Sequence, residues 1–153
     1  MNKIDLILQD ISLEYSIENI EKFCMSVLDK LGINDWEFSI VFCDDDYIKE
    51  LNSTYRKKNE ATDILTFSDT DSDWDFGTPD DGKLYYAGDI ALSVETLRKN
   101  AEYFKVVEGE ELKRLLIHGI LHLNGMDHET NNSDEEMIIY QENILKDFGE
   151  IVF

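Results

Sequence analysis

The sequence predicts an α+β fold, in which a single layer of about four strands, forming a small mixed sheet, is covered by about five helices. Two observations predict this class. Segments with apolar residues at every second position are interleaved with segments whose apolar residues recur every three or four positions, yet regular strand–helix–strand repeats are absent. The chain has 153 residues, 42% of them hydrophobic, which is enough for one buried core, and no Pro/Gly/Ser-rich linker divides it. We therefore expect residues 1–153 to form one domain.

The first four elements have recognisable starts and ends. Residues 4–8 are mostly apolar with one acid among them, and they predict the first strand. Ser16 is a suitable N-cap for the helix that follows, and Gly32 is a suitable stop. Residues 36–42 alternate as a second strand. The acids at 44–46 then open a shorter helix, where negative charge is favourable.

The second half of the chain continues this pattern. Residues 64–67 predict a third, short strand, and residues 85–92 predict a fourth, interrupted at Gly88-Asp89. Ser93 caps the next helix. A longer helix is expected from about residue 110 to 124, because its leucines and isoleucines fall on one stripe.

The last predicted helix begins at a capping box, Ser133-x-x-Glu136, and ends at Gly149. Four apolar side chains recur at helical spacing along it and are expected to be buried: Met137, Tyr140, Ile144 and Phe148.

The segment 69–81 holds six aspartates and the only proline of the chain. Its composition favours a solvated loop. The alternation of acids from Asp69 to Asp75 also suggests a Ca²⁺ site. However, the sixth position of such a loop lacks glycine, and the twelfth position is Asp80 instead of glutamate.

The overall charge is strongly negative, with 14 basic and 34 acidic residues giving a net charge of −20. This balance argues against a simple polyanion binder and against a protein that lies on a membrane surface. No stretch approaches the roughly 18 apolar residues of a membrane span. The two cysteines, Cys24 and Cys43, form no metal-binding or redox pair motif, so we expect reduced, packed thiols in a cytoplasmic protein.

All three histidines fall within residues 118–128. His118 and His122 are four residues apart on a predicted helix, a spacing that separates them by about 40° around the axis and about 6 Å along it. Gly125 can end the helix and turn the chain back, which would bring His128 towards them. Three neutral imidazoles arranged in this way form a metal site with an open coordination position. The site would consist of two histidines on the helix and a third that follows the glycine turn. The alternative is three unrelated histidines.

The same spacing occurs in metzincin-type proteases, whose motif is H-E-x-x-H-x-x-G-x-x-H. Those enzymes carry a glutamate as general base at the position of Gly119. Without that carboxylate, peptide hydrolysis becomes the weaker interpretation.

Three motifs of the chain resemble the YbeY family of metal-dependent endoribonucleases of rRNA maturation. The segment His118-Gly119-x-x-His122-x-x-Gly125-x-Asp127-His128 is similar to the family signature H-G-x-L-H-L-x-G-x-D-H. Leu51-Asn52-x-x-Tyr55-Arg56 with Thr62-Asp63-Ile64-Leu65-Thr66-Phe67 is similar to L-N-x-x-Y-R…T-D-V-L-S-F, and Gly88-Asp89-Ile90-Ala91-Leu92-Ser93 is similar to G-D-I-x-I-S. The blocks occur in family order over nearly the whole chain. Ser68, where members often have proline, and the long acidic segment depart from the pattern.

The resemblance implies one metal ion, usually zinc, on His118, His122 and His128, although another divalent transition metal is possible. It implies cleavage of single-stranded RNA, 16S rRNA 3′-end maturation and ribosome quality control in the bacterial cytoplasm. The small ribosomal subunit and an assembly GTPase are the partners expected from it, with no membrane involved. It also assigns a conserved catalytic arginine to Arg56, which could hold a phosphate oxygen during cleavage.

Two aspartates lie within these motifs, and each has a functional and a structural interpretation. Asp127 is a candidate to accept a hydrogen bond from a metal-binding imidazole, and its alternative is a turn cap. Asp89 is expected to support the fold or the cleft. Two other functions stay open at this point: a metallopeptidase without the glutamate base, and a non-catalytic ribosome-assembly factor stabilised by metal.

The basic residues are partly clustered in spite of the net charge. The clusters are Arg56-Lys57-Lys58, Arg98-Lys99 and Lys113-Arg114. We expect some of them, together with the metal, to form a locally positive groove. Binding to free RNA should then be weak and should depend on a docked ribosomal partner.

Overall fold

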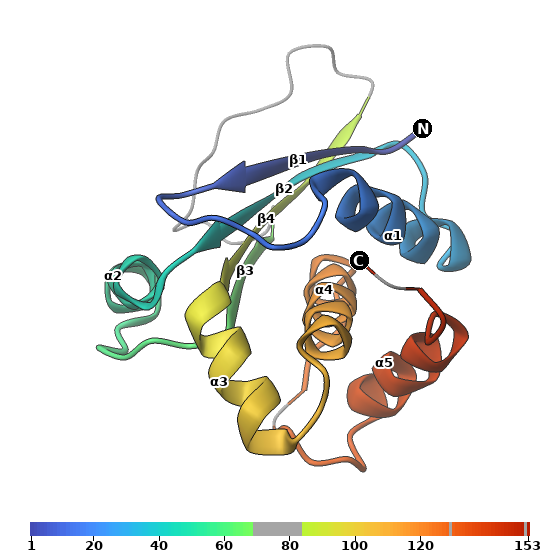
Figure 1. Cartoon of the computed structure of the whole chain (residues 1–153). Coiled ribbons are helices and arrows are strands. Elements are labelled where there is room, and N and C mark those ends of the chain that lie inside the picture. The colour runs from blue at the N-terminus through green and yellow to red at the C-terminus, as the bar shows by residue number, and fades with distance from the viewer. Residues whose placement is uncertain (69–83, 129, 152) are drawn as a thin grey trace.

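The computed structural model of the protein describes residues 1–68, 84–128, 130–151 and 153. The described elements follow the order β1 (Lys3–Leu8), α1 (Ile17–Lys30), β2 (Trp36–Cys43), α2 (Asp45–Arg56), β3 (Ile64–Ser68), β4 (Tyr85–Ser93), α3 (Val94–Phe104), α4 (Glu108–Leu123) and α5 (Glu136–Asp147). Figure 1 shows the sheet with the helices arranged around it. The predicted α+β class, with four strands and five helices in the described part of the chain, is confirmed.

The four strands form one mixed sheet in the order β1-β2-β4-β3. β1, β2 and β4 run parallel to one another, whereas β3 pairs antiparallel with β4 at the edge of the sheet. β4 is continuous, so the interruption expected at Gly88-Asp89 is wrong. A register shift against Glu37 and Phe38 of β2 absorbs the irregularity there.

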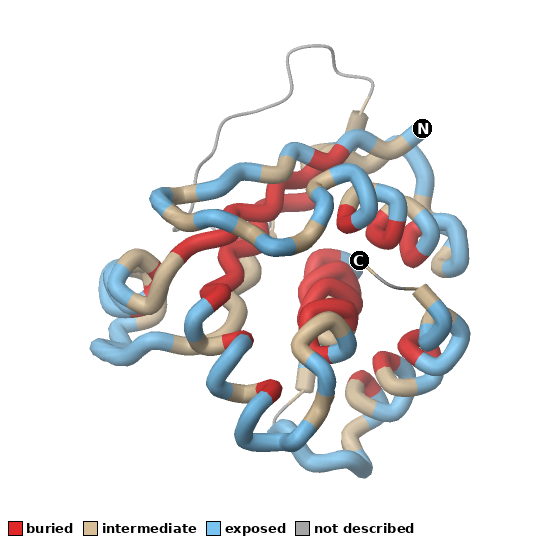
Figure 2. The backbone as a smooth tube through the Cα atoms, viewed as in Figure 1, coloured by how far each residue is buried: buried red, intermediate tan, exposed pale blue. Residues whose placement is uncertain are grey.

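The two faces of the sheet have different covers. On one face, Phe38, Ile40 and Ile90 belong to the main core with residues of α1, α4 and α5. On the other face, Val41 and Ala91 pack with Ile48 of α2 in a smaller cluster. Figure 2 shows the buried positions concentrated in the central strands and along α4. α4 is therefore the central helix of the larger layer.

Most of the helix ends agree with the sequence. Ser16, Asp44 and Ser93 each accept a hydrogen bond from a backbone N–H in the first turn of α1, α2 and α3. Cys24 and Cys43 are buried free thiols, and burial raises the pKa of each to about 12. The prediction of reduced, packed thiols is confirmed.

The start and the orientation of α5 differ from the prediction. Its N-cap is Glu135, and no side chain caps the helix, so the Ser133-x-x-Glu136 capping box is wrong. The chain turns just before the helix, because the Glu135 backbone N–H donates to the Asn132 carbonyl. Tyr140 is 43% exposed instead of buried, and Gln141 is buried in the α5 stripe.

Two other expectations bear on the outline of the molecule. The acidic segment 69–81 lies outside the described residues, so both its loop and its cation interpretations stay untested. In the part of the chain that the structure describes, no helix combines the length and the apolar character needed to cross a membrane.

Candidate metal centre

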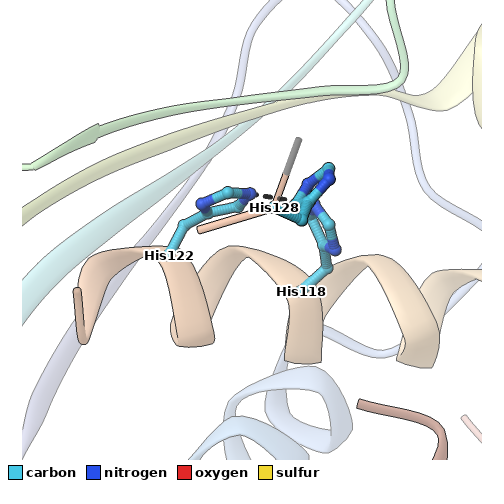
Figure 3. Close-up of side chains that lie close together, drawn as sticks. All are labelled: His118, His122 and His128. Carbon is cyan, nitrogen blue, oxygen red and sulfur yellow. Dashed lines mark hydrogen bonds between the residues drawn. The ribbon is translucent and has the colours of Figure 1, made fainter. Parts of the chain in front are cut away.

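Close packing of α4 against the sheet places two of the histidines. A Cβ atom at Gly119 would lie 2.9 Å from Ile90 Cδ1 and 3.1 Å from Ile64 Cδ1, so the helix touches the sheet where it has no side chain. His118 and His122 lie on either side of this contact and point from α4 to the same side, as Figure 3 shows. The helical spacing therefore places both imidazoles at the edge of the sheet–helix interface.

A glycine turn at the end of α4 brings in the third histidine. Gly125 has φ +90°, a conformation that favours glycine, and its N–H donates to the His122 carbonyl. The Met126 N–H donates to the Leu121 carbonyl, which completes a Schellman motif. The chain reverses there, and His128 comes to lie across from the two helical histidines. The predicted turn is confirmed.

The three imidazoles converge through their Nε2 atoms. The Nε2 of His118 lies 3.0 Å from that of His122 and 3.2 Å from that of His128. Candidate ligand atoms of all three lie within 4.8 Å of one another. Nitrogens bound at about 2.0–2.1 Å to one tetrahedral ion are roughly 3.3 Å apart, so the spacing fits a shared metal ion. This group could therefore hold a metal.

Gln141 of α5 fixes the orientation of the His118 ring. Its Oε1 lies 2.6 Å from His118 Nδ1, while its Nε2 donates to Glu142 Oε2 at 3.1 Å. Because the amide nitrogen faces a carboxylate, the amide oxygen faces the imidazole and accepts a hydrogen bond from Nδ1–H. The lone pair of His118 is then on Nε2, which faces the other two rings.

Arg114 of α4 holds this arrangement in place. Its guanidinium donates to Glu142, with Nε 3.0 Å from Oε2, and to Glu111 at 2.7 Å. Neither Gln141 nor Arg114 was among the predicted site residues. The signal for Gln141 was its spacing with Met137 and Ile144 on α5, which places a glutamine on the inward face of that helix.

The other two rings are held by backbone groups. His128 Nδ1 lies 2.7 Å from the Thr130 carbonyl oxygen, and His122 has a hydrogen bond with the Met126 backbone. Burial lowers the pKa of His118, and burial with repulsion from His118 lowers the pKa of His122 to about 4. Both rings are therefore neutral at pH 7, the form that binds a metal.

The two aspartates have structural contacts. Asp127 Oδ1 accepts a hydrogen bond from the His128 backbone N–H at 2.8 Å, which is the contact expected of a turn cap. That Asp127 accepts a hydrogen bond from a metal-binding imidazole stays a prediction. Asp89 is buried in β4 and accepts hydrogen bonds from Tyr86, at 2.5 Å, and from Ser39. Burial raises its pKa to about 6. Asp89 supports the sheet, as expected.

Arg56 lies in the same cleft as the histidines. The cleft has a volume of about 630 Å³ and is lined by the three histidines, by Arg56, by β3 and by the turn after α4. Arg56 Nη2 donates to the Thr66 carbonyl at 2.8 Å, and its guanidinium carbon lies 4.8 Å from the centre of the Phe67 ring. These two contacts hold the guanidinium at the wall of the cleft.

The predicted positive groove forms only in part. Two of the three basic clusters are bound to acidic or carbonyl groups: Arg98 to Glu108, Lys99 to Asp45, Arg114 to Glu110, Glu111 and Glu142, and Lys113 to the carbonyls of Phe148 and Ile151. The third cluster is different, because Lys57 and Lys58 are exposed and make no ion pair within the described residues. Within these clusters, Arg98, Lys99 and Arg114 are each paired with described carboxylates.

Comparison with known proteins identifies relatives over most of the chain. A family model described as "Endoribonuclease YbeY" matches residues 5–149. A protein described as Endoribonuclease YbeY from Treponema denticola is 44% identical over 130 residues, which cover 84% of this chain and 81% of that relative. Another with the same description, from Borreliella burgdorferi, is 43% identical over 146 residues, or 94% of each chain. The solution structure of TM1509 from Thermotoga maritima matches with a TM-score of 0.64 and 30% identity, over 96% of this chain and 90% of that one.

Proposed function

Since the chain belongs to the YbeY endoribonuclease family, it is an endoribonuclease, and we propose that it cuts single-stranded RNA with one metal ion held by His118, His122 and His128. The observation that supports this assignment is the convergence of three Nε2 atoms in the cleft that also contains Arg56. Three protein ligands leave one position of a tetrahedral ion open for water or substrate.

Zinc is the proposed ion, because three neutral imidazoles and an open position are typical of catalytic zinc. Imidazole also suits other divalent transition metals. When bound, such an ion would polarise a phosphoryl oxygen and lower the pKa of water, so that a hydroxide nucleophile is available near neutral pH. The chain's own contribution is to hold the three rings neutral and oriented, through Gln141, Thr130 and the Met126 backbone.

Arg56 is the proposed phosphate-binding residue. Its guanidinium is planar and forked, which suits two oxygens of a phosphate better than an ammonium group does. The Thr66 carbonyl and the Phe67 ring hold it at the cleft wall before substrate arrives. Positioned donors of this kind stabilise the charge that develops on a phosphate during cleavage.

Peptide hydrolysis and a purely structural metal are the two alternatives, and nothing favours either. The position of the protease glutamate is Gly119, where a side chain would strike Ile90 and Ile64. The chain therefore has no carboxylate at that point of α4, and a side chain there would require the Cδ1 ends of Ile90 and Ile64 to shift. Membership of the YbeY endoribonuclease family and the cleft at the histidines support the nuclease instead.

The biological setting follows from the family resemblance. We propose that the substrate is rRNA, that the step is 16S rRNA 3′-end maturation together with ribosome quality control, and that the protein acts in the cytoplasm. The small ribosomal subunit and an assembly GTPase are the proposed partners. The net charge of −20 supports this proposal, because a body that repels phosphates needs a partner to place it on RNA.

Metal removal tests the proposed function. The purified protein, stripped with a chelator and then given back Zn²⁺, should lose and regain cleavage of a single-stranded RNA, and a duplex of the same sequence should be cut far more slowly. A peptide library serves as the second substrate. Cleavage of peptides alone would establish the peptidase. A protein that unfolds on chelation, and that cleaves neither substrate when loaded with metal, would establish the structural role.

Gln141 provides a test of how the site is oriented. Gln141→Leu removes the acceptor for His118 Nδ1 and fills the position on the buried face of α5 with an apolar side chain of similar size. We expect Zn²⁺ affinity to fall about 10- to 100-fold, measured by competition with a fluorescent chelator. Gln141→Glu keeps an acceptor for His118 Nδ1 but places a second carboxylate beside Glu142, so it should retain more affinity than Gln141→Leu. Equal affinities for the wild type and Gln141→Leu would show that Gln141 only fills space.

A further inference from the structure

A second cavity adjoins the metal centre on the other side of His118. It has a volume of about 650 Å³ and lies between α3, α4 and α5, which Figure 1 shows side by side. Its lining shares Asp63, Ile64, His118 and Asn131 with the cleft that holds Arg56. The cavity and the cleft are therefore neighbours, and a ligand bound at the metal centre can extend from one into the other.

The walls of the cavity suit a flat, uncharged group. Apolar side chains from four parts of the chain contribute to them: Ile64, Phe104, Val106, Leu115 and Ile138. The polar groups include the carboxylates of Asp63, Glu111 and Glu142, which repel phosphate. Arg114, the one cation of the lining, is already bound between Glu111 and Glu142. The cavity therefore excludes a phosphate and favours a neutral ring that carries N–H donors.

One aromatic side chain of the lining is exposed to solvent and contacts a second exposed ring. Phe104, which lines the cavity, is 61% exposed, and its neighbour Tyr103 is 79% exposed. The two rings meet edge to face with their centres 5.0 Å apart. Large exposed aromatic rings next to a nuclease site are typical of surfaces on which unpaired bases stack.

From these three features we propose that the cavity is a nucleobase subsite, in which a base of the RNA next to the cleaved phosphate stacks on Phe104 and turns its amino group towards the carboxylates. The proposal rests on the proposed function, since it places the base relative to the metal centre. It gives the chain a way to hold RNA through bases, which carry no charge, in spite of its net charge of −20. It also gives a reason for a preference for single strands, because a paired base cannot enter a pocket.

The first experiment removes the ring. Phe104→Ala should raise the KM for a short single-stranded RNA about tenfold, which is the size of one base–aromatic stack, while Zn²⁺ affinity stays unchanged. Phe104→Tyr should restore the wild-type KM. Ile139→Ala is the matched control, because Ile139 is an apolar residue with 47% exposure that does not line the cavity. The exposure of Phe104 means that its removal should leave the fold intact, which thermal unfolding checks.

The second experiment removes the base. A series of RNAs with one abasic nucleotide at successive positions should contain one position where the wild type loses about tenfold in kcat/KM and Phe104→Ala loses nothing further. A wild-type KM for Phe104→Ala, or losses that add at every abasic position, would overturn the subsite. If the wild type cuts no RNA when loaded with metal, the proposed function itself fails. If it cuts and Phe104→Ala matches it, only the subsite fails.

Discussion

Replacing His122 by alanine is expected to reduce RNA cleavage on the order of a thousandfold, because loss of one ligand removes the metal that contributes several kcal/mol to the transition state. His122 Nε2 lies 3.0 Å from His118 Nε2, so no other described ligand can take its place without moving the centre. The measurements are Zn²⁺ content by elemental analysis and the rate of cleavage of a single-stranded RNA. Both should fall together.

The matched control for this change is Asn124→Ala. Asn124 is exposed just past the end of the same helix, and its side chain makes no hydrogen bond within the described residues. This variant should keep one metal ion and full activity. An active His122→Ala protein that retains stoichiometric zinc would contradict the three-histidine centre.

Replacing Arg56 by alanine should lower kcat about 10²- to 10³-fold with the bound metal unchanged, because a positioned donor for the phosphate is lost. Arg56→Lys should recover only part of the rate, since an ammonium group cannot form the planar, forked contact. Loss of the hydrogen bond to the Thr66 carbonyl should cost stability as well, by about 1 kcal/mol. Urea unfolding separates this cost from the effect on kcat.

Lys58→Ala distinguishes a specific contact from general positive charge. Lys58 is exposed two residues from Arg56 and carries the same charge. If the cleft needs only cations, Lys58→Ala and Arg56→Ala will have similar effects. We expect Lys58→Ala to raise the KM for RNA at low salt, because one positive charge is lost, and to leave kcat nearly unchanged.

Much of the fold could be predicted because its signals are local. Ser16, Asp44 and Ser93 cap their helices through contacts three residues away, and the alternation of β2 depends only on its own side chains. His118, His122 and His128 could be brought together for the same reason. Helix periodicity and one glycine turn determine their positions.

The features that were missed depend on contacts distant in sequence. Gln141 is buried because it meets His118, 23 residues away, and this contact also turns Tyr140 towards solvent. Its spacing with Met137 and Ile144 places Gln141 on the inward face of α5, but no pattern within α5 indicates that it meets His118. The predicted positive groove was only partly correct for the same reason. Lys99, for example, forms an ion pair with Asp45, which is far away in the sequence.

The central claim is that a metal ion held by the three histidines is required for RNA cleavage, and titration tests it most directly. Metal-free protein is given Zn²⁺ in steps, and both bound zinc and the initial rate of cleavage of a single-stranded RNA are measured at each step. We expect the rate to rise in proportion to bound zinc and to level off at one ion per chain. Full cleavage by the metal-free protein, or saturation with one zinc ion and no cleavage, would contradict the claim.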